Sequence, residues 1–368
     1  MTVEERQAGF MLHCMKQWRR TTLRVMMPMY YLESNFSLTQ DEQDEVAREL
    51  GAQDPEEEKR FRKAHFISDK IGFGDTRIEV DHTMLKRPSY KLRCGGFATI
   101  PTAWAWGGGF LGSRFPKPST LPTFDLEALF EVISNPSVDQ QEVRNIAAEL
   151  LLDSLDRAAA NLIDVPLGNN RHLGLGGYMR GKFPLHHFMS TTFAERMHFA
   201  SRVSLELFLP ATEKRFYINK INEAAFGEHN FQDDNLAAEN VQFLKEQAIA
   251  RLFLRAFDTR IVPGVIFRAS GGLYYKGQQW GFNVGPDFWL QNKAHFSSIN
   301  ASRKTIQEID IPKAKQSIAY QGKIFGGIVL KHKAERNTWF FSLNGDISVF
   351  ERGLGKDYTL SLNFESSF

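Results

Sequence analysis

The sequence predicts an all-β transmembrane fold: an antiparallel up-and-down barrel of about twelve strands, eleven of which are visible. Three observations predict it. Many segments alternate apolar and polar residues with the two-residue period of a strand. These segments follow one another as hairpins, with connections that are short and long in turn. The chain also lacks a run of about 18 apolar residues, so no helical membrane span is expected.

The last two segments alternate most clearly. In residues 337–350, Trp339, Phe341 and Leu343 share one parity, whereas Ser342 and Asn344 share the other. Residues 358–368 repeat this pattern and end on a phenylalanine. A strand flips its side chains at every residue, so each segment has one apolar face and one polar face. Such ribbons suit a wall between lipid and a polar interior.

Nine further segments complete the set of visible strands. They are residues 7–14, 20–31, 72–81, 90–102, 172–183, 196–208, 260–275, 278–291 and 316–331. Many of them are long enough for a tilted membrane span of about 9–11 residues. The clearest hairpin joins 260–275 to 278–291, and Lys276-Gly277 makes its tight turn.

Three stretches between the strands have helical periodicity. Residues 39–66, 124–163 and 235–257 carry apolar residues at the spacing of an amphipathic helix. We interpret residues 1–368 as a single barrel with these stretches as inserts in its long loops. Helices packed on one another outside the barrel, or a plug inside it, would each bury the apolar stripes.

The order of the connections gives the strands a direction. Short and long connections alternate until the last link, residues 351–355, which is short. Outer-membrane barrels have short periplasmic turns and long external loops, so the C-terminus is placed at the periplasmic side. The first visible strand would then run inward from outside. We therefore expect one more strand and a signal peptide upstream of Met1.

The composition sets weaker limits. A net charge of +2 gives no reason to expect a nucleic-acid partner. Phenylalanine, at 31 residues, and glycine, at 28, suit aromatic girdles and close strand packing, although many soluble β proteins share this feature. Cys14 and Cys94 fall on strands that would not be neighbours, so they are expected to be separate thiols rather than a disulfide framework.

With these features the chain resembles Gram-negative outer-membrane β-barrels of the porin-like or small-transporter type, N-terminally incomplete. The resemblance lies in residues 358–368, in the hairpin 273–285 and in the Gly-Phe-Gly-Asp-Thr segment 72–76. It implies a bacterial outer-membrane location, contact with outer-membrane lipid, and recognition of Phe368 by the barrel assembly machinery. Ser366, on the lipid parity, and the long helical inserts depart from the pattern.

Basic side chains recur on the inner parity. The candidates for lining the lumen and setting its selectivity are Arg93, Arg180, Lys182, Arg196, Arg202, Arg268, Asp287, Asp346 and Lys323. Rings of fixed positive charge in a pore favour anions. In the alternative interpretation, these groups pair with acidic side chains and simply fill a narrow barrel.

The function expected is therefore a porin-like channel for passive passage of small solutes, with an anion bias and no cofactor. One alternative is a non-conducting surface barrel whose helical external loops bind a partner or host surface. Another is a soluble α+β protein, in which the helices would cover the apolar strand faces.

Catalytic interpretations find little support, and the chain is not expected to be an enzyme. His186 and His187 lie together on a turn with no carboxylate at ligand spacing, and no Cys/His metal spacing occurs. Residues 107–109 form a glycine run after a strand but lack the following lysine of a phosphate loop.

Overall fold

The computed structural model describes residues 3–49, 52–87, 89–106, 167–187, 194–220, 254–333 and 338–367. Most of these residues belong to one antiparallel sheet of 13 strands. Its members are β1 (Val3–Trp18), β2 (Thr21–Phe36), β3 (Ile67–Phe73), β4 (Thr76–Arg87), β5 (Tyr90–Ile100), β6 (Trp104–Trp106), β7 (Gly174–Pro184), β8 (Met197–Phe208), β11 (Ile266–Lys276), β12 (Trp280–Gln291), β14 (Ala319–Lys333), β15 (Thr338–Arg352) and β16 (Tyr358–Ser367). The predicted mostly-β antiparallel fold is confirmed.

The 13 strands fill eleven positions in the sheet, which is the number of strands visible in the sequence. β4 pairs with the first part of β2 and β3 pairs with the remainder, so β3 and β4 are one long strand with a break. In the same way β6 continues β5, because β6 pairs with β3 while β5 pairs with β4.

Asp75 holds this break together. One carboxylate oxygen of Asp75 accepts a hydrogen bond from the backbone N–H of Ala103 (3.1 Å), and the other accepts one from Asn169 (2.6 Å). The residue thus ties β3–β4 to β5–β6 and to the start of β7. The Gly-Phe-Gly-Asp-Thr segment therefore marks a bend in a strand.

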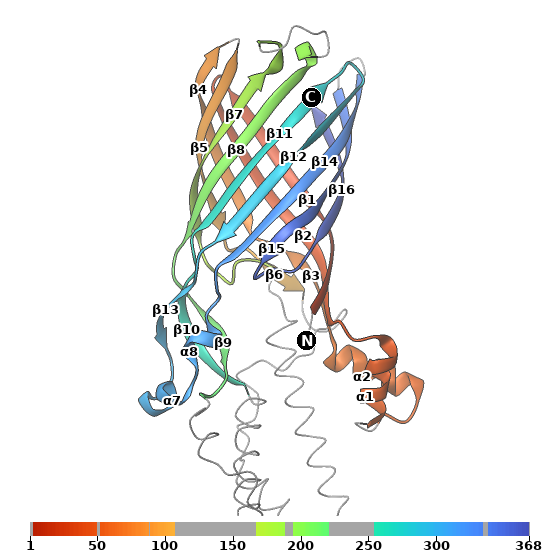
Figure 1. Ribbon diagram of the computed structural model, residues 1–368, viewed down its shortest axis with the longest axis vertical. Helices are drawn as coiled ribbons and strands as arrows, with labels where there is room; N and C mark the ends of the chain where they lie inside the picture. The colour runs from red at the N-terminus through yellow and green to blue at the C-terminus, as the bar shows by residue number, and fades with distance from the viewer. Residues whose placement is uncertain are drawn as a thin grey trace, which may run out of the picture.

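The sheet curls into a tube-like shape, and β1 and β16 are its two edges (Figure 1). Because every position is antiparallel to the next, β1 and β16 run in the same direction. Arg6 of β1 lies close enough to Tyr358 of β16 for an electrostatic interaction. Within the described residues, however, no hydrogen-bonded ladder joins these edges. The predicted closed ring of about twelve strands is not seen.

The two ends of the tube differ, as the sequence predicted. Short turns join the strands at one end, and the inserts gather at the other (Figure 1). Helices α1 (Gln40–Glu49) and α2 (Pro55–His65) follow β2 and pack around Phe36 and Phe66, whose ring centroids lie 6.3 Å apart. The predicted helical insert 124–163, and residues 235–253 of the insert 235–257, lie outside the described residues. Among the described residues, no helix is long and apolar enough to cross a bilayer.

A second sheet, which has three strands, lies beyond the loop end of the tube. It contains β9 (Ala211–Tyr217), β10 (Arg255–Val262) and β13 (His295–Ile299) in the order β13-β10-β9, with α7 (Arg303–Glu308) and α8 (Ile311–Ala314) beside it. Tyr217, Ile261 and Ile309 form its buried centre. The hydroxyls of Tyr217 and Thr259 are 2.6 Å apart.

This second sheet corrects two predictions. Residues 255–257 begin β10 instead of ending a helix, and residues 260–275 are not one strand. Pro263-Gly264 separates β10 of the second sheet from β11 of the main sheet. Proline has no backbone N–H to donate to a neighbouring strand, so strand pairing is interrupted there. A Cβ on Gly264 would lie 1.8 Å from the carbonyl oxygen of Asn292, so only glycine allows this close approach.

Candidate functional site

The two faces of the main sheet have opposite polarity. In β4, Val80 is 47% exposed, whereas its neighbours Glu79 and Asp81 are 0% and 1% exposed. This arrangement is inverted relative to a soluble protein, in which charged residues are almost never fully buried.

Cys14 is exposed and Cys94 is partly buried, and both are free thiols.

Exposed apolar side chains continue around the convex face as an apolar belt. The belt comprises Val80, Met84, Leu175, Met179, Val203, Leu205, Leu207, Leu273, Val284, Ile324, Ile328, Leu330, Phe341, Leu343, Ile347, Val349, Leu360, Leu362 and Phe364. Soluble monomers rarely expose contiguous apolar patches of more than a few hundred Å². The described helices lie beyond the loop end and do not cover the belt (Figure 1). Within the described residues, therefore, no helix covers the apolar strand faces as the soluble α+β alternative would require.

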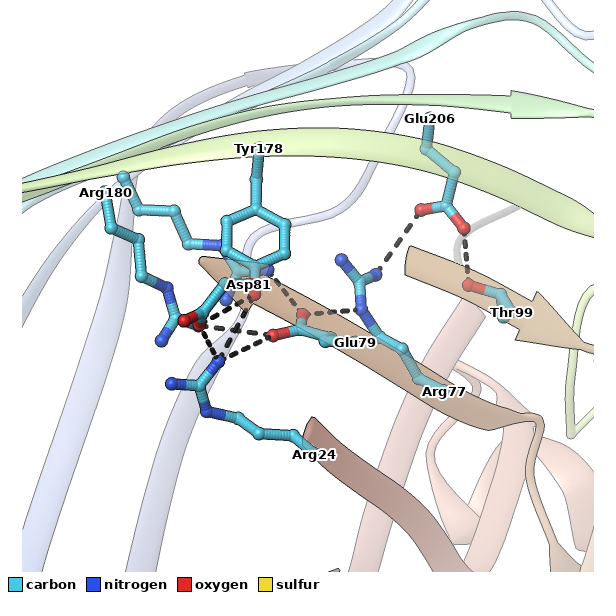
Figure 2. A network of polar contacts seen from close by, with 9 residues as sticks. Arg24, Arg77, Glu79, Asp81, Thr99, Tyr178, Arg180 and Glu206 are labelled. Carbon is cyan, nitrogen blue, oxygen red and sulfur yellow. Dashed lines mark hydrogen bonds and ion pairs between the residues drawn. The ribbon is translucent and has the colours of Figure 1, made fainter. Parts of the chain in front are cut away.

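The concave face holds a group of charged side chains that we call the lumen network. Its members are Arg24, Arg77, Glu79, Asp81, Arg93, Thr99, Tyr178, Arg180, Arg202 and Glu206, from β2, β4, β5, β7 and β8. Figure 2 shows most of them converging on the two buried carboxylates of β4. The strands place them there because each lies on the inward parity of its strand.

Glu79 is the centre of the lumen network. Its carboxylate lies 2.5 Å from Arg202, 3.0 Å from Arg77, 3.4 Å from Arg180 and 3.7 Å from Arg24. Four arginines therefore share one buried carboxylate, so their charge is only partly compensated there.

Asp81 extends the network toward β5 and β7. It lies 2.5 Å from Arg24 and 3.5 Å from Arg93, and it accepts a hydrogen bond from the Tyr178 hydroxyl at 3.1 Å. Arg24 also donates to that hydroxyl at 3.2 Å.

Glu206 completes the network toward the loop end. It accepts a hydrogen bond from Thr99 at 2.5 Å and pairs with Arg77 at 3.5 Å. Five arginines thus face three carboxylates, which leaves a net positive charge.

The network extends over five neighbouring positions of the sheet, from β2 to β8, and does not run along one strand pair. Glu79 is on β4 and Arg202 is on β8, with β5 and β7 between them. In a flat sheet three strand spacings amount to about 14 Å. A contact of 2.5 Å over that interval requires a strongly curved sheet, so the network narrows the interior between β2 and β8.

A cavity of about 410 Å³, the short-turn cavity, lies beside the network toward the short turns. Five cationic residues line it, namely Lys91, Arg93, Arg180, Lys182 and Arg202, and no carboxylate is among its described lining residues. Ser270 and Tyr274, on the inward parity of β11, add hydroxyl groups that can donate hydrogen bonds. This cavity is electrostatically suited to anions.

A larger cavity of about 660 Å³, the loop-side cavity, opens toward the inserts. Its charged lining residues have both signs: His172, Glu213, Arg215, Arg268, Asp287, Lys323 and Asp346. Lys323 pairs with Asp346 at 3.0 Å and with Asp357 at 2.5 Å. Pairing of this kind leaves the loop-side cavity closer to neutral than the short-turn cavity.

His172 links the second sheet to the main sheet at the rim of the loop-side cavity. One ring nitrogen lies 2.8 Å from the carbonyl oxygen of Leu209, and the other lies 2.5 Å from the carboxylate of Glu213. Both partners are acceptors, so both ring nitrogens can donate only in the protonated imidazolium. Burial lowers the pKa of His172, but these hydrogen bonds outweigh burial, and the pKa is raised above its usual value.

The structure separates the predicted lumen residues into two groups. Arg93, Arg180, Lys182 and Arg202 line the short-turn cavity, whereas Arg268, Asp287, Lys323 and Asp346 line the loop-side cavity. Arg196 lines neither cavity. It is exposed in the 3-10 turn Ala194–Arg196 before β8. Phe368 lies outside the described residues.

Sequence reasoning did not select several residues that shape the interior. The alternation of their strands puts Arg24, Glu79, Asp81 and Lys91 on the inward parity, although they are not among the predicted lumen residues. Tyr178 is not among them either. The inward parity of Arg180 two residues later was the signal that could have found Tyr178.

Comparisons with known proteins find similarity among solved structures. No protein-family model matches the chain, and no curated protein matches it. The crystal structure of an outer membrane channel from Pseudomonas putida F1 is similar, with a TM-score of 0.44 and 7% sequence identity, over 98% of this chain and 82% of that chain. At this TM-score the two folds correspond only in outline, so the function is inferred below from this chain's own geometry.

Proposed function

We propose that this chain is an outer-membrane β-barrel that acts as a channel for passive passage of small solutes, with a bias toward anions. The observation that carries the proposal is a pair of polar cavities on the concave face of a sheet whose convex face is apolar. Membrane hydrocarbon would cover the apolar belt, and water and solutes would occupy the interior.

The wall of such a channel has to close between β1 and β16. A bilayer core offers no water to unpaired backbone groups, so an open sheet edge is not tolerated there. Because β1 and β16 run in the same direction, one strand antiparallel to both would fit between them. It would bring the eleven positions to twelve, and bacterial single-chain barrels have even strand counts. We also propose, from the resemblance, that Phe368 serves recognition by the barrel assembly machinery.

The anion bias follows from the distribution of fixed charge. The short-turn cavity and the lumen network share three arginines, and among the described residues the two together hold seven cationic side chains and three carboxylates. A passing anion would be attracted along this part of the interior, and a cation would be repelled. The lumen network would also limit the size of the solutes, because its side chains project into the interior from the wall between β2 and β8.

Planar-bilayer recording tests this function. Folded protein, identified by a band shift between heated and unheated samples, is inserted under a salt gradient. The proposal expects conductance with a reversal potential on the anion-selective side. Substituting both Arg180 and Arg202 by Gln should move the reversal potential toward zero, whereas Arg196→Gln, outside both cavities, should leave it unchanged.

One observation favours a second candidate function. The lumen network spans the interior with many direct contacts, as a barrel filled by its own side chains would require. A folded protein that gives no conductance would support the non-conducting surface barrel, in which the external inserts bind a partner.

A further inference from the structure

Three lysines lie side by side at the short-turn cavity; two of them line it and the third is in register with these two on the next strand. Pairing among the barrel's own side chains does not explain this row. Lys86 of β4 lies directly opposite Lys91 of β5, and Lys91 lies directly opposite Lys182 of β7. We call these three residues the lysine rung. Directly opposed residues have Cβ atoms about 4.5–5.5 Å apart, and like charges in such pairs are destabilising.

A second row of like charges lies one inward-facing position away. Arg93, Arg180 and Arg202 are in register across β5, β7 and β8, and we call them the arginine rung. Inward residues on one strand are two apart, so the two rungs lie about 7 Å from each other. Six cations from four strands therefore face a small region.

The carboxylates of the network compensate only the arginine rung. Arg93 pairs with Asp81, and both Arg180 and Arg202 pair with Glu79. No ion pair with a lysine of the lysine rung is found within the described residues. The charged neighbours of Lys182 are Lys91 and Lys276, and both repel it.

We infer that the short-turn cavity is a binding site for small oxyanions that carry at least two negative charges. A ligand with two anionic groups a few Å apart could contact both rungs, whereas a single monovalent ion could neutralise only one. The volume of about 410 Å³ is within the usual range of about 300–1,000 Å³ for ligand pockets. Hydroxyls and ammonium groups would donate to the ligand's oxygens, as in other charge-assisted contacts.

This inference rests on the proposed channel for its physiological meaning but not for its test. Binding is measured by titration calorimetry on folded protein in detergent, where no conduction is needed. Inorganic pyrophosphate is the probe, and acetate is the monovalent control. We expect saturable pyrophosphate binding and no comparable heat from acetate at the same ionic strength.

Matched variants locate the site. Replacing both Lys91 and Lys182 by Gln should weaken pyrophosphate binding by about tenfold or more, because each of the two substitutions removes a charge-assisted contact with the ligand. Replacing both by Arg should retain most of the affinity. Lys331→Gln removes an inward-parity lysine of β14 that does not line the cavity, so it should bind as the unmodified protein does.

The outcomes separate this inference from the channel proposal. Pyrophosphate binding without conductance would support the binding site and refute the channel function. A second outcome is conductance combined with pyrophosphate binding that is equally strong in the Lys91/Lys182 double variant and in Lys331→Gln. It would refute the binding site and support the channel. Pyrophosphate that binds no better than acetate would overturn the inference as well.

Discussion

Arg24 of β2 donates a hydrogen bond to the hydroxyl of Tyr178 of β7 at 3.2 Å, although β4 and β5 lie between the two strands. The two residues are 154 positions apart in the sequence. Their contact spans three strand spacings of the curved wall and fills part of the interior beside the two cavities. Several predictions of stability and conductance depend on this part of the molecule.

The first concerns Glu79, which four arginines share. Glu79→Gln removes the central negative charge and leaves those guanidinium groups with less compensation inside the sheet. Breaking a buried ion pair by removing one partner costs about 3–5 kcal/mol. The temperature at which the band shift between unheated and heated samples disappears should therefore fall clearly. Glu4→Gln, which breaks only the exposed pair with Arg6, should leave that temperature unchanged.

The second concerns the size of the passage. Tyr178→Ala removes a large side chain that accepts from Arg24 and donates to Asp81. The interior should widen at the lumen network, and single-channel conductance should rise by about twofold. Tyr274→Ala also removes an aromatic ring, but from the wall of the short-turn cavity, so its effect should be smaller. Unchanged conductance in both variants would mean that the network does not restrict the passage.

The third concerns pH and the attachment of the second sheet. The folded-state pKa of His172 is raised by its hydrogen bonds to Glu213 and Leu209. Its stabilisation is therefore fully present below the ordinary pKa of about 6.5 and is lost as pH rises through the folded-state value. Hydrogen exchange of β9 amides, corrected for the intrinsic rate, should be slower at about pH 6 than at about pH 9.

A pair of histidine variants controls this experiment. His172→Gln should remove the difference between the two pH values, because the imidazolium is then absent. His295→Gln changes an exposed histidine in β13 of the same small sheet and should preserve the difference. Equal protection of β9 at both pH values in the unmodified protein would refute the proposed role of His172.

The fourth concerns the apolar belt. Leu343→Arg places a charge on the convex face of β15, where contact with hydrocarbon would cost about 2–4 kcal/mol near the bilayer midplane. Refolding into lipid vesicles should lose yield. Asn344→Arg, one residue later on the concave face, should be tolerated much better. The yields of the two variants are compared by the band shift after the same refolding time.

Polarity alternation predicted most of the main sheet because one face is apolar along nearly every strand. Strand positions, the two kinds of connection and the inward parity of Arg93, Arg180 and Arg202 could all be read from it. The second sheet could not be predicted in this way. β9 and β13 are short, and their pairing with β10 depends on tertiary context more than on local pattern.

The partners of each ion pair also could not be predicted from the sequence. Parity places Glu79 and Arg202 on the same face, but it does not say that β4 and β8 approach across the interior. That approach depends on the curvature of the whole sheet. The buried charges of β4 therefore emerged as the centre of the interior only from the three-dimensional arrangement.

The central claim is that the convex face touches membrane hydrocarbon and the concave face touches water. It is tested most directly with a fluorescent label on Ile347→Cys or on Asp346→Cys, in protein whose Cys14 and Cys94 are replaced by serine and which is inserted into vesicles. Ile347 is exposed on the convex face, whereas Asp346 lines the loop-side cavity. A quencher carried on lipid chains should quench the label at 347 and spare the label at 346, and aqueous iodide should do the reverse. Iodide quenching of both labels alike, with no effect of the lipid quencher, would contradict the account.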